Sequence, residues 1–376
     1  MQPQKSVSSP AEHDSPVLML FESFDVAARL LHLNFIAMKK IQISPRWLLL
    51  VILLAVLIAV ALAPALNAAV GDDDQGSTAH LPEAPHVLQD RLASDSFSIL
   101  SWKKAGGGIM GAKKLTLGYH RDGALIDVKW KRAPRGGDGW NNSPRREIGA
   151  WAVQQLFLES GDYVVPPTAA MCIPLEAYRR FDDDADPNLP RAECVFGVLS
   201  AWLQDVRPPR RLWDRQRFQR HPEYARQVAN LNVLAYLINH QDGRKSNFLV
   251  STRVGDERVF SVDNGLAFSW SFHNFFIRHW NRLRVPALPA ATVERLRAIS
   301  REDLEELAVL AQWERGSDGI YRPVPAGPNL DPEKGHRLHG NTLQIGLTRD
   351  EIDGLANRLA KLLKKLEEGK LGLLDS

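Results

Sequence analysis

The sequence predicts an α+β fold with a strand-rich lobe followed by a helical lobe. Alternating apolar residues and glycine-containing turns over residues 97–131 are typical of strands. After residue 220, apolar residues recur mainly at helical spacing. With 376 residues and 44% apolar content, the chain is long enough to bury a sizeable core. Its 47 Lys and Arg against 44 Asp and Glu give no bulk attraction to nucleic acid, which we exclude as a partner.

Residues 46–68 form a strongly apolar segment. From Trp47 to Leu66, 20 consecutive residues carry no charge, which is about the length of a membrane span. Basic residues precede this segment and three aspartates follow it, so the positive-inside rule places the N-terminus in the cytoplasm. We expect a single-pass membrane protein with a signal-anchor and an extracytoplasmic or lumenal domain. A cleaved secretory signal beginning at Met38 is the alternative, and it exports the same domain.

Composition and pattern divide the chain into further parts. Residues 1–45 are expected to be disordered, and residues 69–95 read as a polar linker. The strand-rich lobe is expected over residues 96–205 and the helical lobe over residues 206–376.

Within these lobes, the helices and a buried strand follow from spacing and caps. Ser-Pro opens a helical pattern at residues 143–160, and a continuous apolar run at residues 194–203 indicates a buried strand. The basic stretch over residues 207–220 is interpreted as a solvated helix face, with contact to an anionic substrate or lipid as the alternative. Further helices are predicted over residues 222–239, 292–314 and 348–368.

The chain has two cysteines, Cys172 and Cys194. In an exported protein they can form a disulfide between strands that flank an acidic insert. Two separate buried thiols fit the sequence equally well, because nothing in it fixes their distance in space.

The segment from Asn239 to Gly265 predicts a β-hairpin with polar residues at its open end. With Gly255 at the centre of the turn, Asn247 lies eight residues before it and Asp263 eight residues after it. Directly opposed residues of an antiparallel pair project to the same face, so this register places Asn247 beside Asp263. A slip of one residue would break the pairing. An amide and a carboxylate oxygen suit Mg²⁺ or Mn²⁺ shared with substrate phosphates.

Asp242 precedes Asn247 by five residues, and His240 precedes Asp242 by two. This is the H-x-D-x-x-x-x-N spacing of a phosphotransferase catalytic loop, in which the aspartate accepts the proton of an attacking hydroxyl. Arg244 follows at a place suited to the transferred phosphate. A solvated hairpin with Asn and Asp in turn positions is the alternative interpretation.

Candidate nucleotide-binding residues lie upstream. The turn "GGGIMG", which includes Gly108 and Gly111, joins two predicted strands and offers backbone N–H groups to phosphates. Lys129 and Lys131 share one face of the following strand, so either can reach the α- and β-phosphates. Glu147 opens the next helix and can pair with that lysine. A strand-edge lysine and a glutamate facing the helix dipole are the structural alternatives.

Over about residues 105–285 the chain resembles the atypical kinases, in particular the type II phosphatidylinositol 4-kinases and the secretory-pathway kinases of the Golgi casein-kinase type. The resemblance rests on "GIMGAKK", "VKWK", "RREIGAWAVQQLF", "VVPPT", "NHQDGRKSN" and "VDNGLAF". It implies a two-lobed protein-kinase-like fold that uses ATP with Mg or Mn. In those families Arg commonly follows the catalytic aspartate, where this chain has Gly243, and "FKP" stands where this chain has "WKR".

Carried over residue by residue, the resemblance implies that Lys131 binds ATP and that Glu147 positions Lys131. It makes Asp242 the catalytic base and Asn247 and Asp263 the metal ligands. Lys129 remains an alternative to Lys131. We therefore expect a membrane-anchored phosphotransferase that acts on a hydroxyl of a protein, a glycan or a phosphoinositide. A non-catalytic binding scaffold and an AMP-transferase or ligase on the same fold are the alternatives.

Overall fold

The structure is a computed structural model that describes residues 79–94, 96–106, 111–140, 142–268 and 280–374. The described residues belong to one compact unit, residues 73–376. The predicted disordered segment and the predicted apolar span at residues 46–68 lie outside the described residues. Among the helices that are described, none has the length and hydrophobicity needed to cross a membrane.

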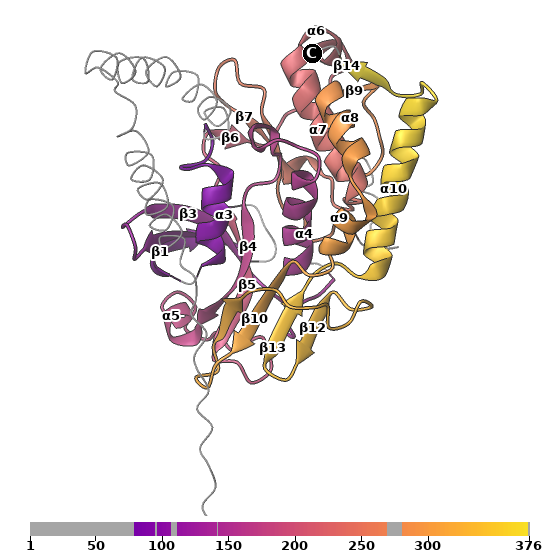
Figure 1. Cartoon of the computed structure of the whole chain (residues 1–376). Helices are drawn as coiled ribbons and strands as arrows, with labels where there is room; N and C mark the ends of the chain where they lie inside the picture. The colour runs from indigo at the N-terminus through magenta and orange to yellow at the C-terminus, as the bar shows by residue number, and fades with distance from the viewer. Residues whose placement is uncertain (1–78, 95, 107–110, 141, 269–279, 375–376) are drawn as a thin grey trace, which may run out of the picture. The chain divides into compact units, whose positions relative to one another are not determined.

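The first half of this unit is built on a five-stranded antiparallel sheet in the order β1-β2-β3-β5-β4 (Figure 1). Its first three strands coincide with the predicted strand-rich segment, and its last strand in sequence matches the predicted buried run. Alternate residues of β2 and β3 are buried, as half-buried strands require. The strands are β1 (Phe97–Lys104), β2 (Lys113–Tyr119), β3 (Leu125–Arg132), β4 (Thr168–Pro174) and β5 (Cys194–Ala201).

The predicted linker contains a packed helix, α3 (Pro85–Ala93), which corrects the prediction for that part of residues 69–95. Leu88 and Leu92, one helical turn apart, are fully buried against the five-stranded sheet. The Gln89 side chain donates to and accepts from the Thr168 backbone at 3.1 and 2.9 Å. Two leucines on a short helix are too weak a periodic signal to stand out in a polar stretch.

Helices gather in the second half around α7 (Pro222–Leu237), nearly all of which is buried. Figure 1 shows α7, α8 (Ala290–Ala298) and α10 (Arg349–Glu367) side by side. Helix α10 contacts both α7 and α8. Helix α4 (Pro144–Gln155) contacts both β4 and α7, so it connects the sheet to the helices. Thr348 and Glu351 form a capping box at the start of α10, which coincides with the helix predicted over residues 348–368.

The helical prediction for residues 292–314 is wrong at its C-terminal end. After α8 and α9 (Arg301–Glu306) the chain forms β10 (Ala311–Arg315), the first strand of a four-stranded antiparallel sheet in the order β11-β10-β13-β12. The apolar residues at helical spacing continue into the strand, which misleads a period-based prediction. The other strands are β11 (Tyr321–Val324), β12 (His336–His339) and β13 (Thr342–Ile345).

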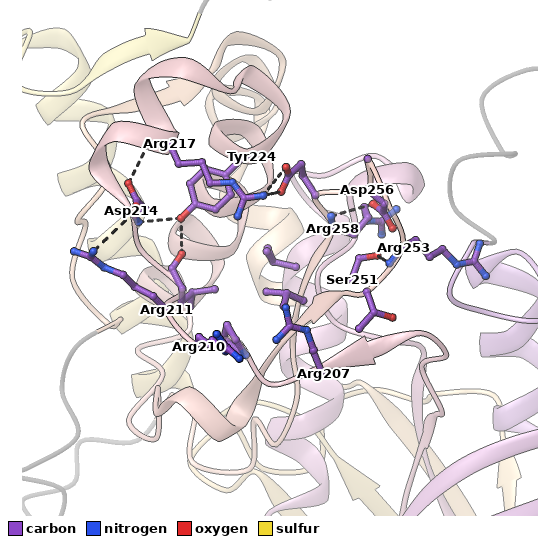
Figure 2. Close-up of a pocket in the computed structure, with 17 residues that line it drawn as sticks. Arg207, Arg210, Arg211, Asp214, Arg217, Tyr224, Ser251, Arg253, Asp256 and Arg258 are labelled. Carbon is purple, nitrogen blue, oxygen red and sulfur yellow. Dashed lines mark hydrogen bonds and ion pairs between the residues drawn. The ribbon is translucent and has the colours of Figure 1, made fainter.

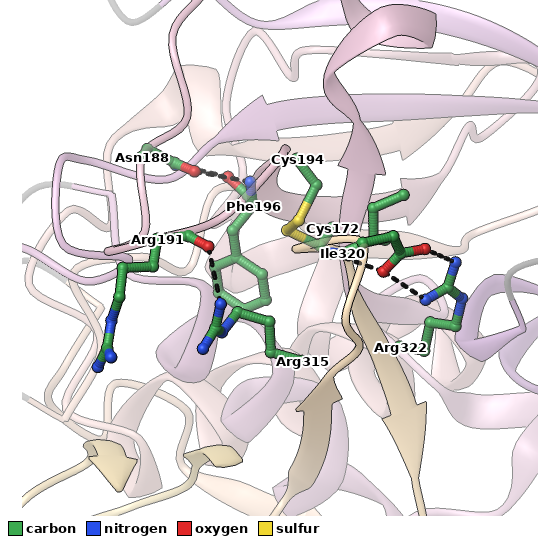
Figure 3. Close-up of a disulfide and its surroundings, with 9 residues drawn as sticks. Cys172, Asn188, Arg191, Cys194, Phe196, Arg315, Ile320 and Arg322 are labelled. Atoms are coloured by element: carbon green, nitrogen blue, oxygen red, sulfur yellow. Dashed lines mark hydrogen bonds and ion pairs between the residues drawn. A yellow bond between two sulfur atoms is a disulfide. The ribbon is translucent and has the colours of Figure 1, made fainter. Parts of the chain in front are cut away.

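This second sheet packs on the back of the first, where the two cysteines form a disulfide (Figure 3). Cys172 on β4 and Cys194 on β5 are joined with their Cα atoms 5.4 Å apart. Trp313 of β10 meets the Phe196 ring edge-on, with ring centroids 5.2 Å apart. The disulfide therefore lies in the core that joins the two sheets, and the alternative of separate thiols is excluded.

Short elements complete the described residues. The basic stretch predicted as a helix face is mostly irregular, because it contains two Pro residues, Pro208 and Pro209, and only its last six residues form a helix. The remaining elements are α5 (Leu175–Arg179), β6 (Val206–Arg207), α6 (Arg215–Arg220), β7 (Phe248–Ser251), β8 (Val259–Ser261), β9 (Ala287–Pro289) and β14 (Gly372–Leu374), with 3-10 turns at Ser160–Asp162 and Lys245–Asn247.

Candidate functional site

Lys131 lies near the end of β3 and joins two carboxylates from distant parts of the chain. Its side chain is 6% exposed, and its ammonium lies 2.5 Å from Glu147 Oε1 and 2.5 Å from Asp263 Oδ1. Glu147 belongs to the first turn of α4, and Asp263 follows β8. Strand, helix and loop therefore meet at a single lysine. The sequence predicts its pairing with Glu147 but not its pairing with Asp263.

The two candidate lysines differ in their contacts within the described residues. Lys129 lies on the same face of β3, two residues away, but no ion pair of its side chain is found among the described residues. Its charge nevertheless lies close enough to lower the pKa of Asp263. Lys129 therefore adds positive potential to the site, whereas Lys131 makes the direct contacts.

Glu147 is held in place from both sides of the start of α4. Its Oε2 accepts a hydrogen bond from the Asn264 backbone N–H at 2.8 Å. In the same helical turn, Arg145 donates to Asp138 at 2.8 Å and to Glu351 of α10 at 2.5 Å. These bonds fix the rotation of α4, so Glu147 faces Lys131 without relying on Lys131 alone.

The electrostatics of this cluster keep Lys131 and Asp263 charged. Burial alone would raise the pKa of Asp263, but the charges of Lys131 and Lys129 outweigh it and lower that pKa to about 2. Burial likewise opposes the charged form of Lys131, and Glu147 and Asp263 outweigh it and raise its pKa. Lys131 and Asp263 therefore remain charged as an ion pair.

The predicted register of the hairpin is wrong by one residue. Phe248 pairs with Ser261, and the Val262 N–H donates to the Asn247 carbonyl at 2.9 Å, so Asn247 lies opposite Val262 rather than Asp263. The connection from Thr252 to Glu257 has an even number of residues, which moves the centre of the turn off Gly255. Asp263 then leaves the strand with φ +66°, a left-handed conformation that aspartate tolerates.

Asn247 and Asp242 meet directly. The Asn247 side-chain amide donates to the Asp242 backbone carbonyl and to Asp242 Oδ2, both at 2.9 Å. Arg244 donates to the same Oδ2 at 2.8 Å. The Asp242 side chain is only 7% exposed, so these bonds fix its orientation. A Cβ at Gly243, which follows Asp242, would lie 3.1 Å from the Trp280 Cβ, a close contact that a larger residue could make only if Trp280 shifted.

The buried imidazole of His240 is influenced electrostatically by both Asp242 and Asp263. Its ring is fully buried edge-on to Phe248, and neither ring nitrogen has a hydrogen-bond partner among the residues that the structure describes. Burial lowers the pKa of His240 to about 4, although Asp242 and Asp263 both oppose this shift by attracting the proton. Both carboxylates therefore lie within electrostatic reach of one neutral imidazole.

The glycine-rich turn contributes less to this picture. Gly111 has φ +66°, which favours glycine, and open space surrounds the position of its absent Cβ. Gly108 lies outside the described residues. Within the described ranges no contact joins Gly111 to the Lys131 cluster, so a phosphate-binding role for both glycines stays a prediction.

The residues of the hairpin suit a cation that is shared with phosphate. No group of three or more His, Cys, Asp or Glu residues able to hold a metal ion occurs in the described part of the chain. Magnesium in nucleotide sites, however, needs only one or two protein oxygens, because phosphates and waters complete its shell. Among the described residues, Asp263 Oδ2 has no hydrogen-bond partner and the Asn247 amide oxygen accepts only a 3.3 Å bond from Ser246, so each oxygen is open to a cation. The register shift removes the side-by-side placement that the sequence predicts for these two residues.

Some contributing residues were not found from sequence. Asn264 is one, since its backbone holds Glu147 and its side chain accepts from Ser261 at 2.7 Å. The "DNG" triplet marked its position but not its partners. The Arg145–Glu351 pair joins residues 206 positions apart, and no local pattern indicates such a contact.

Comparisons with known proteins add a structural likeness. No family model and no curated protein sequence matches the chain. Among solved structures, the chain is similar to a crystal structure of the Golgi casein kinase, with a TM-score of 0.45 and 14% sequence identity. The alignment covers 79% of this chain and 80% of that chain.

Proposed function

We propose that the protein is an ATP-dependent phosphotransferase that moves the γ-phosphate to a hydroxyl group. The observation that carries this proposal is Lys131, held between Glu147 and Asp263 at 2.5 Å from each. Phosphoryl transfer depends on positioning and on charge stabilisation, and such a buried lysine is suited to hold the α- and β-phosphates. Glu147 keeps the ammonium in place, and the bonds around α4 keep Glu147 in place.

Asp263 and Asn247 would hold Mg²⁺ or Mn²⁺, which when bound supplies charge compensation for the phosphate oxygens. The contribution of this chain is a carboxylate that remains ionised at any working pH, because its pKa is lowered to about 2. The amide nitrogen of Asn247 is occupied by Asp242, so its oxygen is the atom left for the cation.

Asp242 is the proposed general base. Its buried carboxylate is oriented by Asn247 and Arg244 at one oxygen, which leaves the other to accept the proton of an acceptor hydroxyl. Arg244 is half exposed, so its guanidinium can turn from Asp242 to the transferred phosphate without a burial penalty. Such an exchange would free Asp242 as the phosphate arrives.

The acceptor class remains a proposal at the level of a hydroxyl on a protein, a glycan or a phosphoinositide. A membrane anchor in the N-terminal segment and an extracytoplasmic or lumenal site also remain proposals, supported by the apolar run and its flanking charges. In an exported location, the Cys172–Cys194 disulfide would be stable.

The test is product analysis after incubation of the full chain with ATP and Mn²⁺. We expect the wild type to form ADP together with a phosphorylated acceptor or free phosphate. The amount of these products should be at least about 100-fold lower with Asp242→Asn and normal with the matched control Asp205→Asn. Asp205 is an exposed aspartate that pairs with Arg253 outside this site. Transfer of AMP to the acceptor, in place of ADP formation, would show adenylyl transfer instead. No turnover of ATP, with partner binding the same in the wild type and in Asp242→Asn, would support a non-catalytic scaffold.

A further inference from the structure

A second basic site lies at the turn of the β7–β8 hairpin. Figure 2 shows the residues that line a pocket between this hairpin, α6 and the segment that follows β6. The pocket has a volume of about 500 Å³. Six arginines and three carboxylates line it, which gives the lining a net charge of +3. The arginines are Arg207, Arg210, Arg211, Arg217, Arg253 and Arg258.

Several of these arginines are not neutralised by the protein. Among the described residues, Arg207 and Arg210 make no ion pair and no side-chain hydrogen bond. Arg211 lies 3.9 Å from Asp214 and its side chain is 76% exposed, so that pair is weak. By contrast, Arg217 is paired with Glu257 and Arg253 with Asp205. The uncompensated charge is therefore concentrated on the β6–α6 segment.

The rest of the lining narrows the ligand class. Guanidinium groups bind phosphate through two parallel hydrogen bonds, and several of them around one concavity suit a ligand with more than one phosphate. Among the described residues that line the pocket, Tyr224 alone is aromatic, and its ring is covered by the Arg217 guanidinium at 4.5 Å. A stacking platform for nucleic-acid bases is thus missing from this pocket. Its volume fits a small molecule.

The pocket is separate from the proposed transfer site. Asn247 and Asp263 flank the inner ends of β7 and β8, whereas the pocket is lined by Val250 and by the turn from Ser251 to Val259. The four residues of β7 span about 13 Å at 3.3 Å per residue. We propose that this pocket binds a small ligand that carries two or more phosphate groups, and that the ligand contacts Arg207 and Arg210.

The test is calorimetric titration of the full chain with inorganic tripolyphosphate. The double variant Arg207→Ala/Arg210→Ala is expected to bind at least about tenfold more weakly than the wild type. The matched control is Arg297→Ala, which removes one exposed arginine of α8 outside the pocket and is expected to bind normally. Tripolyphosphate bound at the proposed nucleotide site would instead be lost in Lys131→Ala and kept in the double variant, so the two variants distinguish the two sites.

A second experiment, with phosphoinositide-containing vesicles, distinguishes a lipid headgroup from a soluble phosphate compound as the ligand. Binding of phosphoinositide-containing vesicles, lost in the double variant and stronger than that of tripolyphosphate, would support the pocket and assign a lipid headgroup as the source. Unchanged tripolyphosphate binding in the double variant, loss of binding in Lys131→Ala alone, or no binding of either probe would overturn the proposal. None of these results depends on catalysis, so failure here leaves the proposed phosphotransferase untouched.

Discussion

In the described part of the chain, charged and polar side chains are partnered and mostly buried at one end of the β7–β8 hairpin, and exposed and partly unpartnered at the other. At the inner end, Asp242, Asn247 and Asp263 are each tied to a partner from another segment or loop position, and Lys131 is almost fully buried. At the outer end, Arg207 and Arg210 are exposed and lack partners among the described residues. The inner end is preorganised by the protein, while the outer end leaves its charge to solvent or to a ligand.

This difference has an energetic consequence. A substitution at the inner end leaves a buried charge without its partner, which typically costs several kcal/mol. A substitution at the outer end removes a solvated charge and leaves the fold nearly unchanged. The two ends are therefore expected to respond differently to the same kind of substitution.

The largest effect is expected for Asp263→Ala on phosphate transfer. Loss of this carboxylate removes the proposed cation ligand, and we expect the rate to fall by at least about 1,000-fold. The rate of ADP formation from ATP measures it, with Asp205→Ala as the control. A variant within tenfold of wild type would separate Asp263 from the chemistry.

A large effect on stability is expected for Lys131→Met. Glu147 would remain buried without its cation, and we expect the free energy of unfolding to fall by about 3 kcal/mol. Urea denaturation measures it, and Lys129→Met, on the same face of β3, is the control with little expected loss. Equal losses in the two variants would contradict the distinction between these lysines.

A smaller effect is expected from pH through His240. Its pKa is about 4 in the folded chain, against the ordinary 6.5, so below pH 6.5 the unfolded chain takes up the proton first. Stability is therefore lost as pH falls from 6.5 towards 4, by about 2 kcal/mol between pH 7 and pH 4.5. Urea denaturation at these two pH values, with a chelator present, should show a smaller pH dependence in His240→Leu. An identical pH dependence in the variant would mean that His240 is not buried in its neutral form.

The smallest effect is expected at the outer end. The Arg207→Ala/Arg210→Ala variant should change the free energy of unfolding by less than about 0.5 kcal/mol, because both side chains are exposed and without ion pairs. Urea denaturation without ligand measures this, and a loss of more than about 1 kcal/mol would mean that these arginines support the fold.

From the sequence, candidate residues at the inner end can be chosen, but the register that determines which of them lie opposite each other cannot. Asp242, Asn247, Asp263 and Glu147 were found because catalytic-loop spacing and the order of elements are local signals. The register could not be fixed, since one residue more or less in the turn shifts every opposed pair, and the loop proved to be even in length.

Long-range packing limited the prediction of the fold. The strands of the first sheet and the helix α4 follow from alternation and from a Ser-Pro start. The sheet that begins at Ala311 was missed because its burial comes from contact with Phe196, more than 100 residues away. The disulfide and the choice of Lys131 were left open for the same reason, since both depend on distances across the sheet.

The most direct test of the account is a calorimetric titration of ATP into the full chain with and without Mn²⁺. The account predicts binding that Mn²⁺ strengthens in the wild type, and that Asp263→Ala binds ATP equally weakly with and without the metal. Binding of ATP that is indifferent to Mn²⁺ in both proteins, or no binding at all, would contradict a metal-nucleotide site at Lys131 and Asp263.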